Sequence, residues 1–309
     1  MSTNIKRFIL KLIAFIPFAF IIYVALVCVW GDFAPGFAMK NLSYRLGGFG
    51  HLHSRLSEVK KVKDVDILVL GSSHAYREID PRIFKKAGYT MFNLGSSAQT
   101  PIQTKVLLNR YLDQLNPKIV IYEVFPKTFS IDGVESALDV ISNDVNDIHS
   151  LSMCAKTMHI KVFNTLLYGF YRDFTGRNKS FVEKKRVGRD TYISGGYLEK
   201  DVQTFKHKHY DKKAWDFQEK QFDDFRENIN LLKSKEVKLY LVNSPIAPAY
   251  YRSYTNNHLF DKRMKQVGEY YDFNKILKLD DSLYFYDADH LNQNGVDIFD
   301  EKLLSIMRK

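Results

Sequence analysis

The sequence has few residues that could cross-link or restrain the chain. Among 309 residues there are only two cysteines, Cys28 and Cys154, and they lie far apart. A disulfide framework or a cysteine metal site needs more cysteines at regular spacing, so the sequence indicates neither. It also lacks internal repeats and low-complexity tracts. The fold must therefore depend on buried apolar side chains, and 45% hydrophobic residues are enough for one large core or two small ones.

Dense basic blocks are missing too. The formal net charge is +10, but no run of lysine and arginine is interleaved with aromatic residues. Nucleic-acid binding therefore has little local support. A basic surface also suits an anionic lipid or an anionic polymer, and both stay open.

Metal-ligand spacing is nearly absent as well. His207 and His209 stand two residues apart, as two ligands on one strand could. A third ligand does not follow nearby, so we interpret this segment as a solvated loop. The sequence predicts no metal ion and no organic cofactor.

One long hydrophobic run is present, at residues 8–30. From Leu12 to Trp30 it has nineteen residues without a charge, about the length that spans a hydrocarbon core. Basic residues stand at its start: Lys6, Arg7 and Lys11. By the positive-inside rule this flank leaves the N-terminus in the cytoplasm. The run therefore predicts a signal anchor, with the rest of the chain outside the cytoplasm.

Three alternatives to an anchor can be weighed. A cleaved signal peptide needs a small-x-small site, and "VCVWGDF" offers none. A lipoprotein signal at Cys28 is disfavoured because Val27 is too bulky for the residue before a modified cysteine. A buried core helix fits poorly with basic flanks at the extreme N-terminus. Residues 31–64, rich in glycine and phenylalanine at first, predict a juxtamembrane linker that ends in a short, solvated helix.

Short apolar runs alternate with helical patterns through the remaining residues, 65–309. Strands are predicted at 65–70, 89–95, 118–126, 237–245 and 282–290. Helices are predicted at 77–88 with a break at Pro81, and at 100–117, 222–236 and 296–307. Such alternation favours an α/β fold with a parallel sheet covered on both faces. Sites in these sheets form at the carboxyl ends of the strands.

The middle region, about 130–215, breaks this rhythm and predicts an inserted cap. It contains the aromatic stretch "IKVFNTLLYGFYRDF" and then a basic, polar stretch. A sugar-stacking surface is one interpretation of these aromatic residues. Ordinary packing against the sheet is the other, and we favour it.

Polar residues follow three of the predicted strands. They are Ser72, Ser73 and His74 after the first strand, Asn93 and Gly95 after the second, and Asp287, Asp289 and His290 after the fifth. A serine on a tight turn is a weak nucleophile at neutral pH and needs a base, which His290 could supply. Asp287 could bind the other imidazole nitrogen and select its tautomer.

Each of these residues also has a structural interpretation. Ser72, Ser73, Asp287 and Asp289 could each cap a helix. A GSS turn could also cradle a phosphate, but the GxGxxG pattern and the P-loop lysine are missing. The catalytic interpretation depends on all three groups meeting at one edge of the sheet.

Three motifs together resemble the SGNH/GDSL hydrolase superfamily: "VDILVLGSSHAYREIDP", "FNLGSSAQTP" and "FYDADHLNQNG". They resemble most the membrane-anchored bacterial branch, whose members O-acetylate cell-surface polysaccharides or D-alanylate teichoic acids. The resemblance covers about 65–305, except for the middle region. It implies a three-layer α/β/α, flavodoxin-like fold.

The resemblance also implies roles for particular residues. Ser73 would be the nucleophile, His290 the base and Asp287 the orienting acid, with Asp289 a bystander. The N–H groups of Ser73 and Gly95 would form the oxyanion hole. The family's GxND motif is absent, since the third strand ends in "YEVFP", so Asn243 after the fourth strand is the candidate left for the third donor.

The predicted function is O-acyl transfer, with acetyl the expected group, onto a cell-surface polysaccharide through an acyl-Ser73 intermediate. A multispanning membrane partner would supply the acyl group, because cytoplasmic acyl-CoA is on the wrong side of the membrane. Two alternatives stay open. One is an extracytoplasmic esterase that deacylates such polymers, and the other is a non-catalytic glycan-binding or scaffold subunit of an export complex.

Overall fold

Five parallel strands form the centre of the fold. The computed structural model describes residues 3–206 and 208–308. The order across the sheet is β2-β1-β3-β7-β8, which is the 2-1-3-4-5 order of flavodoxin-like folds. The strands are β1 (Ile67–Leu70), β2 (Met91–Asn93), β3 (Ile119–Glu123), β7 (Lys238–Asn243) and β8 (Glu269–Asp272).

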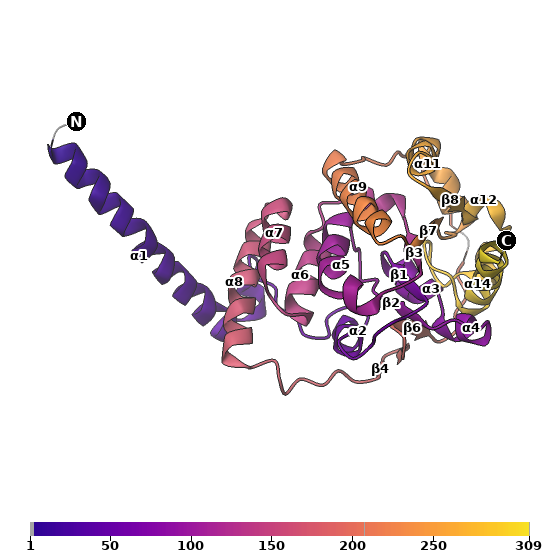
Figure 1. Ribbon diagram of the computed structural model, residues 1–309, viewed down its shortest axis with the longest axis horizontal. Coiled ribbons are helices and arrows are strands. Elements are labelled where there is room, and N and C mark those ends of the chain that lie inside the picture. The colour runs from indigo at the N-terminus through magenta and orange to yellow at the C-terminus, as the bar shows by residue number, and fades with distance from the viewer. Residues whose placement is uncertain (1–2, 207, 309) are drawn as a thin grey trace.

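Helices cover both faces of this sheet, because successive side chains of a strand point to opposite sides. Leu68 and Leu70 enter the core on one side, and Ile67 and Val69 the core on the other. The first side holds α2 (Leu52–Val59), α5 (Pro101–Leu115), α6 (Val134–Asn143), α7 (Ile148–Thr157), α8 (Ile160–Thr175), α9 (Glu219–Ser234) and α11 (Asn257–Lys265). The second side holds α3 (Ser73–Glu78), α4 (Pro81–Lys86), α12 (Phe273–Ile276) and α14 (Gln293–Met307). The predicted three-layer α/β/α architecture is confirmed (Figure 1).

The remaining short helices lie in the connections. They are η1 (Gly36–Ala38), η2 (Pro126–Phe129), α10 (Pro248–Ser253) and α13 (Asp281–Tyr284). The helix break predicted at Pro81 is confirmed, because α3 ends at Glu78 and Asp80 caps α4 by accepting from the Arg82 N–H.

The fifth strand lies elsewhere than the sequence predicted. Residues 282–290 do not form a strand; their start belongs to α13, which is capped by Asp280, and Phe285 makes an isolated bridge to Leu291. The edge position is taken by β8, which pairs with β7 alone. Only the last of the four residues of this edge strand, Asp272, is buried, so the strand needs no continuous apolar run and its sequence lacks the signal of a buried strand.

The expected solvated helix before residue 65 is buried instead. Leu52, Leu56 and Val59 of α2 are fully buried in the core of the first side. Arg55 is also fully buried, donates to the carbonyl oxygens of Gly196 and Gly50, and lies over the ring of Tyr76. The α/β domain therefore begins well before Val65, within the segment predicted to be a linker.

The insertion at 130–215 divides between the two faces of the sheet. Its helices α6, α7 and α8 pack on the first side, as described above. Its second half forms a small antiparallel sheet of β4 (Arg186–Val187), β5 (Asp190–Ile193) and β6 (Tyr197–Lys200). Tyr197 of β6 is buried in the core of the second side. Tyr168 of α8 is buried as well, so packing rather than sugar stacking describes the aromatic side chains that are buried here.

A long helix, α1 (Thr3–Phe33), projects away from the α/β domain (Figure 1). It includes Pro17 and leaves most of its apolar side chains exposed. It is long and apolar enough to cross a membrane, and it lies near the N-terminus. Such a helix is either a signal sequence or a single membrane anchor.

Candidate active site

Ser73 lies directly after the turn that follows β1. Gly71 has a φ of 140° in this turn, and a Cβ atom there would lie 2.9 Å from the carbonyl oxygen of Glu123. Only glycine therefore fits between β1 and β3. Ser72 is the N-cap of α3, and Ser73 is the first helical residue, whose N–H has no partner within the helix. The turn lies between β1 and β3, where the strand order reverses and flavodoxin-like folds bind ligands.

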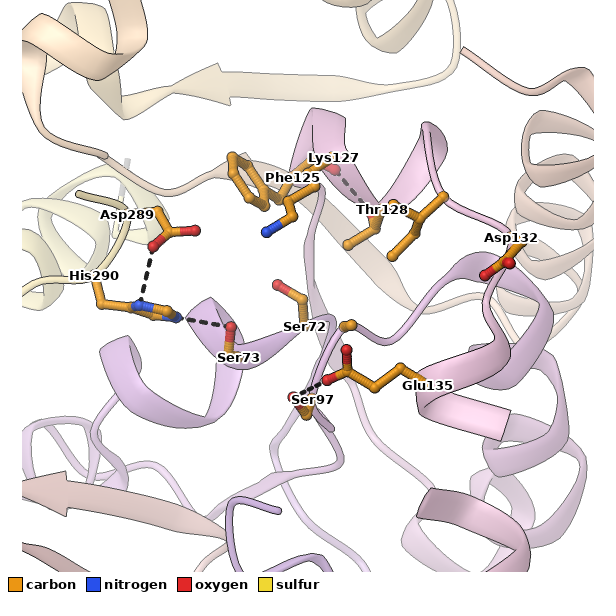
Figure 2. Close-up of a pocket in the computed structure, with 12 residues that line it drawn as sticks. Ser72, Ser73, Ser97, Phe125, Lys127, Thr128, Asp132, Glu135, Asp289 and His290 are labelled. Carbon is orange, nitrogen blue, oxygen red and sulfur yellow. Dashed lines mark hydrogen bonds and ion pairs between the residues drawn. The ribbon is translucent and has the colours of Figure 1, made fainter. Parts of the chain in front are cut away.

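The hydroxyl of Ser73 faces the imidazole of His290, as Figure 2 shows. Its Oγ lies 2.8 Å from Nε2 of His290. On the other side of the ring, Nδ1 lies 3.0 Å and 3.1 Å from the two carboxylate oxygens of Asp287. An ionised carboxylate only accepts, so Nδ1 carries a proton and, in the neutral ring, Nε2 is left to accept from Ser73. The predicted residues thus form one hydrogen-bonded chain, although their catalytic roles stay predictions.

A tight turn holds Asp287 and His290 in this geometry. Oδ1 of Asp287 accepts from the N–H groups of Asp289 and His290, at 3.0 Å and 2.8 Å. The ring of Tyr286 stacks on His290 with an interplanar angle of 1°. Because Asp287 stands three residues before His290, its carboxylate can bind both the backbone N–H and the ring of His290.

Asp289 also contacts His290, although it was expected to be a bystander. Its Oδ1 lies 3.4 Å from Nδ1 of His290, and its side chain lines the cavity (Figure 2). Burial favours a neutral His290, but hydrogen bonds to Asp287 and Asp289 and their charges outweigh it and raise the pKa of His290 to about 10. Burial also opposes the charge of Asp289, yet the imidazole holds the pKa of this carboxyl well below its ordinary value. The resting site therefore favours an imidazolium.

Two further residues, His74 and Glu123, form a second polar layer behind the triad. Glu123 is fully buried and accepts from the N–H and the hydroxyl of Ser72, at 2.8 Å and 2.9 Å. Nδ1 of His74 lies 3.2 Å from Oγ of Ser72, and its Nε2 donates to the carbonyl oxygen of Asp289. The His74 ring also stacks on His290, with centroids 5.0 Å apart. This layer connects the end of β3 to the turn that carries the base.

Both groups of this second layer have shifted pKa values. Burial and the charge of His290 lower the pKa of His74 to about 3. Burial raises the pKa of Glu123 to about 7, against the hydrogen bonds from Ser72. A neutral His74 that donates from Nε2 has an acceptor at Nδ1, so the single hydroxyl proton of Ser72 lies between two acceptors, His74 and Glu123. The sequence alone assigned no role to these two residues, although His74 follows Ser73 directly and Glu123 ends the third strand.

The two expected oxyanion donors outside Ser73 have other partners. Gly95 is buried, and its N–H donates to Oδ1 of Asn93 at 2.9 Å rather than to the cavity. Asn243 is buried too, and its amide faces Tyr270 and Asp272 on the β7–β8 side of the sheet. The structure therefore does not support Asn243 as a donor, and Gly95 would have to release Asn93 to become one. Parallel pairing of β7 with β8 explains why Asn243 turns toward Asp272.

The cavity beside Ser73 has a volume of about 420 Å³. Its described lining includes four charged residues of both signs: Lys127, Asp132, Glu135 and Asp289. Ser97 donates to Glu135 on the opposite wall (Figure 2). A cavity of this size, whose wall mixes these charged residues with apolar ones such as Phe125, suits a hydroxylated ligand better than a long acyl chain.

Metal ligation was not predicted, and one group of residues has the geometry for it. Donor atoms of Asp287, Asp289 and His290 lie within 4.8 Å of one another. Nδ1 of His290 is bound to Asp287, so a metal ion there would have to displace the proton that orients the base. Of the histidine pair in the loop, His209 is fully exposed, and His207 lies outside the described residues.

Comparison with known proteins gives matches at the level of structure. No protein-family model matches the chain, and no curated protein matches it in sequence. A solved protein from Bacteroides fragilis, assigned as an acylhydrolase, is similar at 13% identity and a TM-score of 0.42, over 84% of this chain and 96% of that one. A GDSL-like lipase from Bacteroides thetaiotaomicron is similar at 12% identity and a TM-score of 0.41, over 84% of this chain and 98% of that one.

Proposed function

We propose that this protein is a membrane-anchored serine acyl-transfer enzyme that O-acetylates a cell-surface polysaccharide. The observation that carries the proposal is the hydrogen-bonded chain from Ser73 through His290 to Asp287 on the wall of a cavity. The resemblance of the GSSH and DADH motifs to SGNH hydrolases supports the same residues independently of the geometry. An activated serine beside an oriented imidazole is the arrangement that acyl transfer requires.

The reaction proceeds in two transfers. Oγ of Ser73 attacks the carbonyl carbon of the acyl donor, while Nε2 of His290 takes the hydroxyl proton and passes it to the leaving oxygen. The Ser73 N–H donates to the carbonyl oxygen as negative charge develops on it. The acceptor hydroxyl then gives its proton to His290 and attacks acyl-Ser73, which restores the serine and releases the ester.

A polymeric acceptor is supported by a second cavity. This cavity has a volume of about 470 Å³ and shares Asp132 and Glu135 with the first. Its described lining also includes Arg45, Phe49 and Lys161. Carboxylates that accept from sugar hydroxyls and an exposed aromatic ring suit a glycan longer than one residue. The acceptor chain lies along both cavities in this proposal.

Anchoring and donor supply complete the proposal. α1 serves as an uncleaved anchor, and the α/β domain lies outside the cytoplasm, where the polysaccharide is. The acyl donor reaches this side through a multispanning membrane partner. The basic flank before α1 and the absence of a small-x-small site support an anchor over a cleaved signal.

The proposal can be tested with the full chain in detergent and 4-nitrophenyl acetate. We expect a burst of nitrophenol and an acetyl group on Ser73, detected by mass spectrometry of the intact chain. Ser73→Ala should abolish both, whereas Ser234→Ala, at the exposed end of α9, should retain both. Asp287→Asn should slow turnover by about 10⁴-fold, as the comparable change does in serine proteases.

An acceptor then distinguishes the alternatives. Faster turnover with an acetylated oligosaccharide as product supports a transferase. Equally fast turnover in water alone identifies an esterase and contradicts the transfer step. Absence of any acylation on Ser73, with glycan binding retained, contradicts an enzymatic role and leaves the non-catalytic subunit.

A further inference from the structure

The corner between α7 and α8 exposes large apolar side chains. Met158 is 79% exposed, Ile160 52% and Phe163 42%. One face of α7 continues this surface with Ile148 and Leu151, while the opposite face of the same helix is buried in the core. A helix that is apolar on both faces has a second partner beyond its own domain. We call these five residues the α7–α8 corner.

Contacts between α1 and α8 show where this corner lies along α1. Near the end of α1, Asp32 accepts from the hydroxyl groups of Tyr168 and Tyr171, at 2.8 Å and 2.9 Å. Further toward the N-terminus, the hydroxyl of Tyr23 donates to Asn164. The two helices therefore advance in the same direction, and the first turn of α8 lies beside the last third of α1, near Tyr23 and Trp30.

The corner reaches this level because Ile160 is one turn before Asn164. Ile160 lines a cavity of about 340 Å³ together with Tyr23, Leu26 and Trp30 of α1. Tyr23 precedes Asp32 by nine residues, which is about 13 Å of helix. The charge-free part of α1 ends just before Asp32. Ile160 therefore lies beside residues that belong to this charge-free part.

This level is membrane rather than water if α1 spans the bilayer with its charge-free residues. A run of about 20 residues is needed to cross the hydrocarbon core. Because the charge-free run begins at Leu12, a span of this length extends beyond Tyr23. Trp30, nearer to the end of α1, also suits the interfacial belt of one leaflet, where aromatic residues with a polar edge gather. The apolar corner at this depth would face acyl chains, which explains its exposure.

We propose that the α7–α8 corner is a second membrane contact, embedded in the leaflet through which α1 leaves the bilayer. This inference rests on the proposed role of α1 as an anchor. Two contacts fix the orientation of the domain, whereas one helix alone would let it rotate. Lys161, next to Ile160, lines the second of the two cavities, so the end of the proposed acceptor site away from Ser73 lies close to the membrane surface.

Site-directed spin labelling of the full chain tests this proposal. The chain, with Cys28→Ala and Cys154→Ala, is placed in vesicles of phosphatidylethanolamine and phosphatidylglycerol at 3:1. Single labels are introduced by Met158→Cys and Phe163→Cys. Phe15→Cys in α1 serves as the reference for lipid, and Lys262→Cys on α11, at the far end of the domain, as the reference for water (Figure 1).

We expect the labels at 158 and 163 to lose accessibility to a water-soluble nickel chelate and to collide with oxygen, as the label at 15 does. The label at 262 should show the reverse. If the labels at 158 and 163 match the one at 262 while the label at 15 is in lipid, the corner is not a membrane contact. If the label at 15 is itself in water, the anchor is wrong and this inference falls with it.

Discussion

Two carboxylates act on one imidazole in the turn of residues 287–290. Asp287 orients the ring through Nδ1, and Asp289 adds a second negative charge 3.4 Å from the same nitrogen. The second charge stabilises the imidazolium and so raises the pKa of the base. A base must be neutral to accept the serine proton, so this site should work best at alkaline pH.

The first prediction concerns the pH dependence of acylation. Since the pKa of His290 is raised above its ordinary value, the burst rate should rise with pH well above pH 7 in the native protein. Asp289→Asn removes one stabilising charge and should move this rise to lower pH by about one unit. Asp132→Asn is the matched control, because Asp132 lines the same cavity and accepts from the Val134 N–H. This variant should leave the pH of the rise unchanged. Identical profiles for the two variants would contradict the role of Asp289.

The second prediction concerns His74 as a positioning residue. His74→Phe retains a ring against His290 but loses the hydrogen bonds to Ser72 and to the Asp289 carbonyl group. A displaced turn should lower the burst rate constant by about ten- to a hundredfold, with the burst amplitude unchanged in the folded protein. His53→Phe, a similar change beside the distant Phe181, is the matched control. A normal rate constant with a lowered melting temperature would show that His74 only stabilises the fold.

At the scale of elements, the segment between α1 and β1 is part of the domain. Leu52, Leu56 and Val59 of α2 are fully buried, and Arg55 joins this helix to the loop at Gly196. The free energy of unfolding lost when one such side chain is truncated is a large share of the net stability of a domain. α2 should therefore be necessary for folding.

The third prediction compares two truncated chains. A chain that begins at Ala34 retains α2 and should unfold cooperatively, whereas one that begins at Val65 should not. In the longer chain, Leu56→Ala should lower the free energy of unfolding by about 2–5 kcal/mol, because it leaves a cavity in the core. Denaturant titration followed by circular dichroism measures both effects. Cooperative unfolding of the shorter chain would show that α2 is dispensable.

At the scale of the whole molecule, the proposed anchor α1 would place the domain on one side of a membrane. The site and the two neighbouring cavities belong to the domain, and α1 contacts the domain through α8. Topology therefore decides which substrates the site can meet.

The fourth prediction is the orientation of the domain. Alkaline phosphatase joined to the C-terminus should be active in cells, because it matures only outside the cytoplasm. Changing the basic flank, with Lys6→Glu, Arg7→Glu and Lys11→Glu, should lower this activity, since the flank sets the orientation. A fusion that is inactive in the native form and active in the charge variant would reverse the predicted topology.

The sequence by itself determined the alternation of strands and helices, the apolar helix and the three residues, Ser73, Asp287 and His290, that the structure brings together. These depend on local patterns: apolar runs before Gly71 and Gly95, a charge-free stretch after Lys11, and a carboxylate three residues before a histidine. Only the tertiary structure decided which strand stands at the edge, that α2 is core, and that Glu123 and His74 support the base. An edge strand and a buried polar network leave no repeating pattern of apolar residues in the sequence. Their stability comes from partners that are far away in the chain. Asp289 shows the same limit, because its effect on His290 depends on a distance that spacing along the chain does not determine.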